Sequence, residues 1–155
     1  ALRALQRDPS FVNGAVIQGA GTSAAWGDGD LFVVEADESD GSFLLYDVAV
    51  ALITNIDTDH LDHSGDGASL EGAFDTFAAG ELLVLSADDP ATRRLADRRR
   101  EVGGTVPVLS FGEAADADVR LVAIAETGPI RYTVAVDGAE HTGELAIPGR
   151  HNALN

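Results

Sequence analysis

Short apolar runs recur along the chain, and few polar residues interrupt them. Residues 31–36 (LFVVEA) and 48–56 (VAVALITNI) form two such runs, and residues 82–85 and 106–109 form two more. An apolar run without polar alternation is typical of a strand that is buried on both faces, as in a parallel sheet. The pattern therefore predicts four buried strands of a parallel sheet.

Two helical patterns lie between the later runs. The first has apolar residues at helical spacing, namely Leu70, Ala73, Phe74, Phe77 and Ala78. Ser69 is placed to cap this helix, and Asp89 followed by Pro90 is a favourable start for the second helix. The second helix would turn Leu95 inward and the arginines at 98–100 outward. Strands that alternate with helices favour an α/β fold with a doubly wound, mostly parallel sheet.

The pattern changes near the end of the chain. Apolar and polar residues alternate over 130–136, which is the period of a half-buried strand. Asp137 and Gly138 then give the signal of a tight hairpin turn, and a return strand follows at 142–147. With a further strand at 119–124, these residues predict a small antiparallel β subregion.

The patterns divide the chain into three subregions. We expect an α/β core over 1–112, antiparallel strands over 118–147 and the start of a helix at 148–155. Residues 14–29 are rich in Gly, Ala and Ser and predict mostly loop. The chain has no Met and stops soon after its last helix begins, so both ends look like cuts in a longer sequence.

The composition excludes several classes of function. The formal net charge is −16, with 26 acidic and 10 basic side chains, so phosphate backbones and anionic membranes would be repelled. Without cysteine, the chain forms no disulfide and no thiolate metal site, which fits the cytoplasm. No apolar run approaches the roughly 20 residues that span a bilayer. The acidity is that of a solvated surface or of carboxylates that attract divalent cations.

Two acidic clusters each follow a predicted buried strand. The first, at 35–40, begins with Glu35, and the second, at 55–62, holds Asn55, His60 and three aspartates. Ligands of open α/β sheets bind beyond the carboxyl ends of strands, and Mg²⁺ prefers carboxylate oxygens. A histidine beside carboxylates is a common pairing in metal sites. Each cluster is therefore a candidate metal site, and the alternative is an acidic surface turn.

A third polar cluster lies at 148–155, where Pro-Gly precedes the last predicted helix. Free N–H groups at a helix start favour anions, and an Asn amide can pair with an adenine edge. A simple capped helix start is the alternative. The 155 residues contain no GxxxxGK[ST] loop and no Lys at all, so they supply no phosphate-cradling P-loop.

Four segments together resemble the central domain of the Mur ligase family. They are EADESDGSF (35–43), TNIDTDHLD (54–62), SADDP (86–90) and PGRHNALN (148–155). Their order and approximate spacing match that family, and they cover nearly the whole chain. The resemblance implies a P-loop-NTPase-like α/β domain, with a mostly parallel sheet flanked by helices and a small antiparallel part.

The resemblance also implies an activity, namely ATP-dependent formation of an amide bond in peptidoglycan precursor synthesis, in the cytoplasm and with Mg²⁺. Residues 8–19 (DPSFVNGAVIQG) and the ESD at 38–40 are similar to members that join L-alanine to UDP-N-acetylmuramate through an acyl phosphate. A member that adds a murein tripeptide is the alternative enzyme. An acidic structural domain that binds divalent cations is the alternative outside enzymes.

The family's functional residues carry over to six positions. By resemblance, Glu35 binds a metal ion near the ATP phosphates, and His60 holds a second metal near the acyl phosphate. Asn55 corresponds to a polar group beside the nucleotide or metal. Three residues match the segment that lines the ATP site, with the last aligned to adenine: His151, Asn152 and Asn155.

The resemblance places further parts of the enzyme outside these residues. The family's P-loop and UDP-sugar domain come before such a central domain, and a C-terminal domain follows it. We therefore expect the 155 residues alone to be inactive, and to be either marginally stable or self-associated through apolar surface that those parts would cover.

Overall fold

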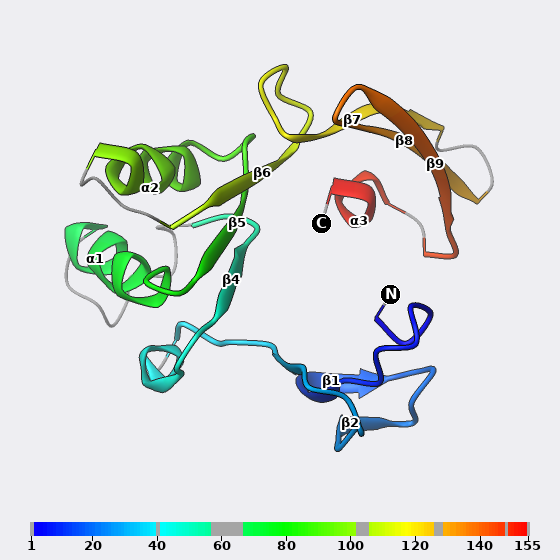
Figure 1. The fold of residues 1–155 in the computed structure, drawn as a ribbon, viewed down its shortest axis with the longest axis horizontal. Coiled ribbons are helices and arrows are strands. Elements are labelled where there is room, and N and C mark those ends of the chain that lie inside the picture. Colours follow the sequence, from blue (N-terminus) through cyan, green and yellow to red (C-terminus); the bar gives the residue numbers. More distant parts are fainter. Residues whose placement is uncertain are drawn as a thin grey trace. The chain divides into compact units, whose positions relative to one another are not determined.

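The computed structural model describes residues 2–39, 41–56, 67–101, 106–125, 129–147 and 149–154. The chain divides into two compact units, Ala1–Phe43 and Leu44–Asn155. The first unit contains a three-stranded sheet, and the second contains a six-stranded sheet with its helices (Figure 1).

The first unit has its strands in the order β2-β1-β3. β1 (Ser10–Ile17) pairs antiparallel with β2 (Thr22–Ala25), and β3 (Phe32–Val34) pairs parallel with the other edge of β1. The prediction of mostly loop over 14–29 is therefore wrong for residues 14–17 and 22–25, which belong to these strands. Main-chain hydrogen bonds form this hairpin while most of its side chains stay exposed, so the sequence has no burial pattern there.

β3 confirms a strand within 31–36, but the predicted burial on both faces is wrong. Phe32 is 59% exposed and Val33 is 44% exposed. The Phe32 ring stacks on Trp26, with ring centroids 6.0 Å apart. An apolar run alone does not distinguish a strand inside a layered sheet from a strand of a small open sheet.

The second unit has its six strands in the order β4-β5-β6-β7-β8-β9. The strands are β4 (Val50–Ile53), β5 (Leu82–Ser86), β6 (Val108–Gly112), β7 (Val119–Ala125), β8 (Ile130–Val136) and β9 (Ala139–Leu145). The first four are parallel, and the last three form an antiparallel meander. Asp137 (φ +50°) and Gly138 (φ +78°) make the turn between β8 and β9. The predicted combination of a mostly parallel sheet and an antiparallel part is confirmed.

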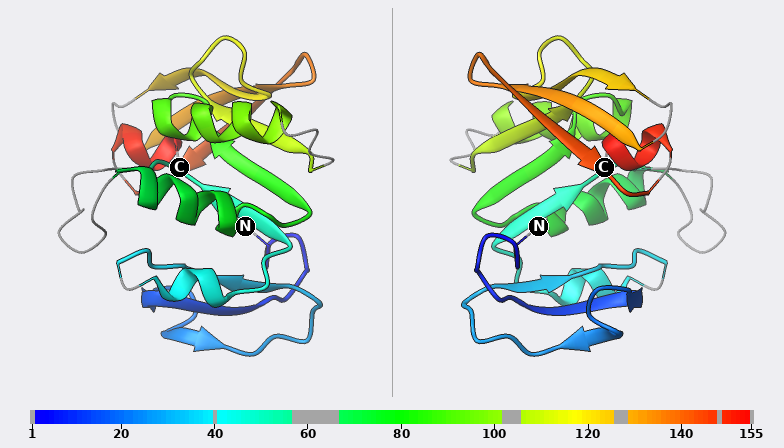
Figure 2. Two further views of the ribbon diagram at one scale, coloured as in Figure 1. Left: turned by 90° about the vertical axis from the view of Figure 1, so that its left-hand side faces the viewer. Right: turned by 90° about the vertical axis from the view of Figure 1, so that its right-hand side faces the viewer.

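Two helices cover one face of the parallel strands. α1 (Gly67–Phe77) and α2 (Pro90–Glu101) lie side by side on the same side of β4, β5 and β6 (Figures 1 and 2). Leu83 of β5 and Leu95 of α2 are fully buried, whereas Leu52 of β4 is 58% exposed. α1 begins before Ser69, so the predicted cap at Ser69 is wrong, while the predicted start of α2 at Pro90 is confirmed.

Ion pairs join the two helices. Glu71 of α1 binds Arg94 (2.8 Å) and Arg98 (2.9 Å), and Arg98 also reaches Asp75 (3.0 Å). The prediction that the arginines at 98–100 point outward is therefore wrong for Arg98, because the acidic face of α1 attracts it. None of the described helices is long and apolar enough to cross a membrane.

A short helix ends the described chain. α3 (Arg150–Leu154) lies against β7 and β8, and none of its residues is buried. It confirms the predicted start of a helix within 148–155. The short 3-10 helix η1 (Ser42–Leu45) bridges the boundary between the two units along the chain.

Candidate functional site

The carboxyl ends of β4, β5 and β6 meet at one edge of the second unit's sheet, because these strands are parallel. Asn55 follows β4, Asp88 and Asp89 follow β5, and Glu113 follows β6. In open α/β sheets this edge is where ligands bind. The candidate site of the second unit is therefore built on these three strand ends.

Asp89 fastens the end of β4 to the start of α2. Its Oδ1 accepts a hydrogen bond from Thr92 N at 2.8 Å, which is the N-cap that the sequence predicts. The same oxygen accepts a longer bond from Ile56 N at 3.4 Å, the residue after Asn55. Thr92 is fully buried and donates its hydroxyl to Ser86 O at 2.6 Å. Asp89 thus holds the turn that carries Asn55.

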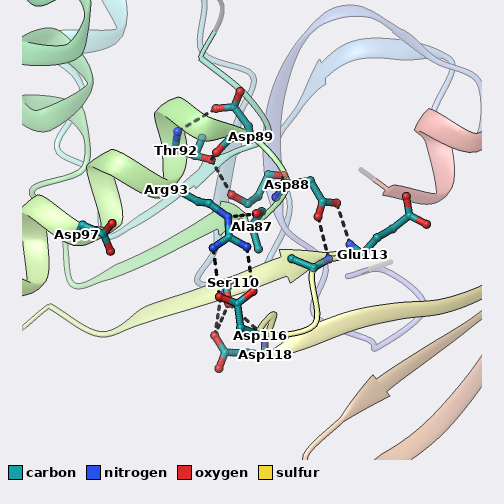
Figure 3. A network of polar contacts seen from close by, with 12 residues as sticks. Ala87, Asp88, Asp89, Thr92, Arg93, Asp97, Ser110, Glu113, Asp116 and Asp118 are labelled. Atoms are coloured by element: carbon teal, nitrogen blue, oxygen red, sulfur yellow. Dashed lines mark hydrogen bonds and ion pairs between the residues drawn. The ribbon is translucent and has the colours of Figure 1, made fainter.

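Asp88 fastens the end of β5 to the turn after β6. Its two carboxylate oxygens accept hydrogen bonds from Glu113 N (2.8 Å) and Ala114 N (2.9 Å), as Figure 3 shows. Gly112 has φ +144°, and a Cβ at this residue would lie 2.5 Å from Asp88 Oδ2. Only glycine leaves room here for the carboxylate, so the position of the Asp88 side chain depends on glycine at residue 112.

Arg93 of α2 ties the same two loops together from the other side. Its Nε donates to Ala87 O, and its two Nη atoms form a bidentate pair with Asp116 at 3.1 and 2.8 Å (Figure 3). This pairing lowers the pKa of the Asp116 carboxyl below its usual range. Planar two-point pairing of this kind fixes orientation as well as distance.

Asp118 closes the β6–β7 connection. Its Oδ2 accepts hydrogen bonds from the Ser110 hydroxyl (2.7 Å) and from Ser110 N (2.8 Å). These two bonds, the hydroxyl first, lower the pKa of Asp118 because they favour its charged form. The loop between Gly112 and β7 is thus anchored by side-chain carboxylates at both ends.

The start of α3 is joined to the same loop. Arg150 forms an ion pair with Glu113, the residue whose backbone Asp88 holds. The His151 ring packs against Gly149 (φ +108°), where a Cβ would lie 2.5 Å from His151 Cε1. Asn152 N donates to Gly149 O at 3.0 Å and closes the first turn.

Neighbouring aspartates thus connect two of the predicted site segments. Asp89 reaches the turn of Asn55, and Asp88 reaches α3 through Glu113. Both aspartates lie in one of the segments that carry the family resemblance, but the sequence predicts only a helix cap for Asp89 and no role for Asp88. The rule that ligand loops follow parallel strands was the signal that could have found them.

Glu35 lies in the first unit, directly after β3. Its backbone N donates to Val12 O at 2.9 Å, which extends the ladder between β3 and β1 by one residue. Its exposed side chain is oriented by Gly14 N, which donates to Oε2 at 2.7 Å. Oε1 accepts no hydrogen bond from any residue that the structure describes. His60 and Asn155 lie outside the described residues.

The carboxylate of Glu35 fits the ligand requirement of the magnesium ion that the family resemblance implies. Among the described residues, no group of three or more acidic or histidine side chains could enclose a metal. Mg²⁺ does not need one, because it binds through one or two carboxylates together with water and phosphate oxygens. A single carboxylate, fixed through one oxygen and open at the other, meets that requirement.

The sequence matches the Mur ligase middle domain over residues 21–155. The UDP-N-acetylmuramate–L-alanine ligase of Clavibacter sepedonicus is 54% identical over 157 residues, which cover 100% of this chain and 32% of that protein. The chain therefore spans about a third of the length of this relative.

Solved structures of Mur ligases share the fold. The UDP-N-acetylmuramate:L-alanyl-gamma-D-glutamyl-meso-diaminopimelate ligase of Neisseria meningitides gives a TM-score of 0.81 at 22% identity, covering 99% of this chain and 51% of that one. The UDP-N-acetylmuramate–alanine ligase of Thermotoga maritima gives 0.79 at 24% identity, covering 99% and 34%. The MurF ligase of Thermotoga maritima, solved in complex with ADP, gives 0.66 at 16% identity, covering 92% and 35%. The chain belongs to the Mur ligase family, whose middle domain its residues 21–155 match.

Proposed function

We propose that the protein containing this chain is an ATP-dependent ligase that joins L-alanine to UDP-N-acetylmuramate. One observation carries the proposal: 54% identity, over the full chain, to a ligase named for that reaction. The product would be a precursor of peptidoglycan. Because the reaction consumes ATP, we place it in the cytoplasm.

The proposed reaction has two steps. The γ-phosphoryl group of ATP moves to the carboxylate of UDP-N-acetylmuramate, which gives an acyl phosphate and ADP. The amine of L-alanine then attacks the acyl carbon, loses a proton and expels inorganic phosphate. Bound Mg²⁺ supplies positive charge that offsets the charge on the transferring phosphoryl group. The contribution of the chain is to position these groups.

Glu35 is the proposed Mg²⁺ ligand of the first unit. Its backbone bond to Val12 and its side-chain bond from Gly14 N hold the carboxylate in one orientation, which supports this role. A preorganised ligand needs no rearrangement when the ion arrives. His60 is the proposed ligand of a second metal ion, on the strength of the family resemblance of its segment.

The polar residues of the second unit are proposed to serve the nucleotide. Asn55 follows β4 in a turn that Asp89 holds, which supports a fixed role beside the nucleotide or metal. Three residues at the chain's last helix are proposed to line the ATP site: His151, Asn152 and Asn155.

A ligase that adds a murein tripeptide to UDP-N-acetylmuramate is the second candidate. The solved tripeptide-type ligase of Neisseria meningitides has the same fold, with a TM-score of 0.81, so fold alone does not separate the two reactions. The identity to the L-alanine enzyme, at 54%, favours the first candidate.

The test is a substrate comparison with the purified full-length protein. It is incubated with ATP, Mg²⁺ and UDP-N-acetylmuramate, and with either L-alanine or the tripeptide L-alanyl-γ-D-glutamyl-meso-diaminopimelate. We expect mass spectrometry to find the L-alanine adduct, with one ADP formed for each amide bond. An adduct with the tripeptide alone, or with neither amine, would contradict the proposal.

A further inference from the structure

The start of α3 needs support from outside the helix. The described part of α3 is lightly packed, because Arg150 and His151 are exposed and the next three residues are only half-buried. Its position against β7 and β8 therefore depends on contacts of exposed and half-buried side chains. The ion pair between Arg150 and Glu113 is such a contact, at the first residue of the helix.

Glu113 is itself held by Asp88. Glu113 N and the next amide, Ala114 N, donate to the two oxygens of the Asp88 carboxylate at 2.8 and 2.9 Å (Figure 3). Hydrogen bonds to an ionised acceptor are stronger than neutral ones. Gly112 leaves the space that this carboxylate fills. The chain of contacts runs from the end of β5 through Asp88 and Glu113 to Arg150.

We propose that Asp88 and Glu113 are positioning residues for the nucleotide-binding segment at the start of α3. They touch no reacting group; they act through Arg150, and so set where His151 and Asn152 lie. This inference rests on the proposed function, because it assumes that the α3 segment binds ATP. Neither Asp88 nor Glu113 is among the six site positions that the sequence predicts.

If the ion pair were merely structural, its loss would lower the stability of the folded enzyme and would not act on ATP binding in particular. Glu113 and Arg150 are both more than 40% exposed on their side chains, and exposed ion pairs add little to stability. Loss of the pair should therefore leave the melting temperature almost unchanged while it weakens nucleotide binding. A change in the KM for ATP without a change in kcat separates positioning from general destabilisation.

The test uses the full-length enzyme with UDP-N-acetylmuramate, L-alanine and varied ATP. We expect Glu113→Gln to raise the KM for ATP about 3-fold and Asp88→Asn to raise it about 10-fold, with kcat at saturating ATP within about 2-fold of wild type. The KM for UDP-N-acetylmuramate should not change. Glu144→Gln is the control, since it removes a different and more exposed ion pair, with Arg131 at 3.4 Å, between β8 and β9.

A double-mutant cycle tests the route through Arg150. In an Arg150→Gln background, Glu113→Gln should raise the KM for ATP no further, because its partner is already gone. Equal effects in both backgrounds would overturn the proposal, as would an unchanged KM for ATP in folded, active Glu113→Gln enzyme. If Asp88→Asn fails to fold, the exposed Glu113 variants decide alone. A wild-type enzyme that forms no L-alanine adduct and binds no ADP would overturn the proposed function and this inference with it.

Discussion

The carboxylate of Asp88 occupies the space that any side chain at Gly112 would need. A Cβ at residue 112 would lie 2.5 Å from Oδ2 and 2.7 Å from Cγ of Asp88, and the backbone there has φ +144°. Both the steric and the backbone requirement select glycine. The pair fixes the point at which β6 turns into the loop of Glu113.

Gly112→Ala should therefore destabilise the second unit. The backbone strain alone is about 1–3 kcal/mol, and displacement of the Asp88 carboxylate adds to it. Urea unfolding of the wild type and the variant measures the difference. In an Asp88→Ala background the same substitution should be less destabilising, because the carboxylate is absent. An equal loss of stability in both backgrounds would show that the contact with Asp88 is unimportant.

Asp89→Ala should shorten or loosen the start of α2. Loss of the N-cap bond to Thr92 N destabilises a helix by about 1 kcal/mol. Asp89→Asn is the control, because asparagine caps helices about as well as aspartate does. Urea unfolding gives the stabilities, and hydrogen exchange at Thr92 N–H reports the cap itself. If Thr92 N–H exchanges as slowly in the Ala variant as in the Asn variant, Asp89 does not cap α2.

The stability of the second unit should depend on pH through Asp118. Its pKa is lowered by the Ser110 hydroxyl and backbone N–H, whereas the pKa of an aspartate in the unfolded chain is about 3.9. The folded state then binds fewer protons than the unfolded state between these two values. The stabilisation is thus present above about pH 4 and is lost as the pH falls through the lowered pKa.

NMR titration of the Asp118 carboxyl in wild type and Ser110→Ala tests this cause directly. Removal of the hydroxyl should raise the pKa of Asp118 toward its ordinary value, and stability should begin to fall at a higher pH. The backbone N–H of Ser110 remains, so the shift should be partial. An Asp118 pKa that is the same in both proteins would assign the shift to another cause.

Local signals predicted the parts of the fold that depend on neighbours in sequence. Asp89 followed by Pro90 marks the start of α2, and Asp137-Gly138 marks the turn between β8 and β9, because a cap and a tight turn are each set within about four residues. The period of 130–136 likewise predicted the strand β8, although the observed burial does not alternate, because every residue from 132 to 136 is half-buried.

Features that depend on distant partners were not predictable in this way. The hairpin within 14–29 forms through main-chain bonds, so it has no apolar period in the sequence. Arg98 turns toward α1 because it pairs with Glu71, which is 27 residues away in sequence. Of the site, the candidate residues were identified from strand ends and family resemblance. The hydrogen bonds through which Asp88 and Asp89 hold these residues join positions far apart in sequence, so only the three-dimensional structure shows them.

Glu35→Gln in the full-length protein tests the proposal that this chain supplies metal and nucleotide ligands of an ATP-dependent ligase. The variant nearly keeps the shape of the side chain but loses the charge that would bind Mg²⁺. Glu38→Gln, an exposed change in the same acidic turn, is the matched control.

The measurement is kcat for L-alanine ligation at varied Mg²⁺, with folding checked by circular dichroism. We expect Glu35→Gln, and His60→Ala with it, to lower kcat at least about 100-fold, which corresponds to about 2.7 kcal/mol of barrier. Glu38→Gln should stay close to wild type. A folded Glu35→Gln enzyme with wild-type kcat at low Mg²⁺ would contradict the proposed role of Glu35 as a Mg²⁺ ligand.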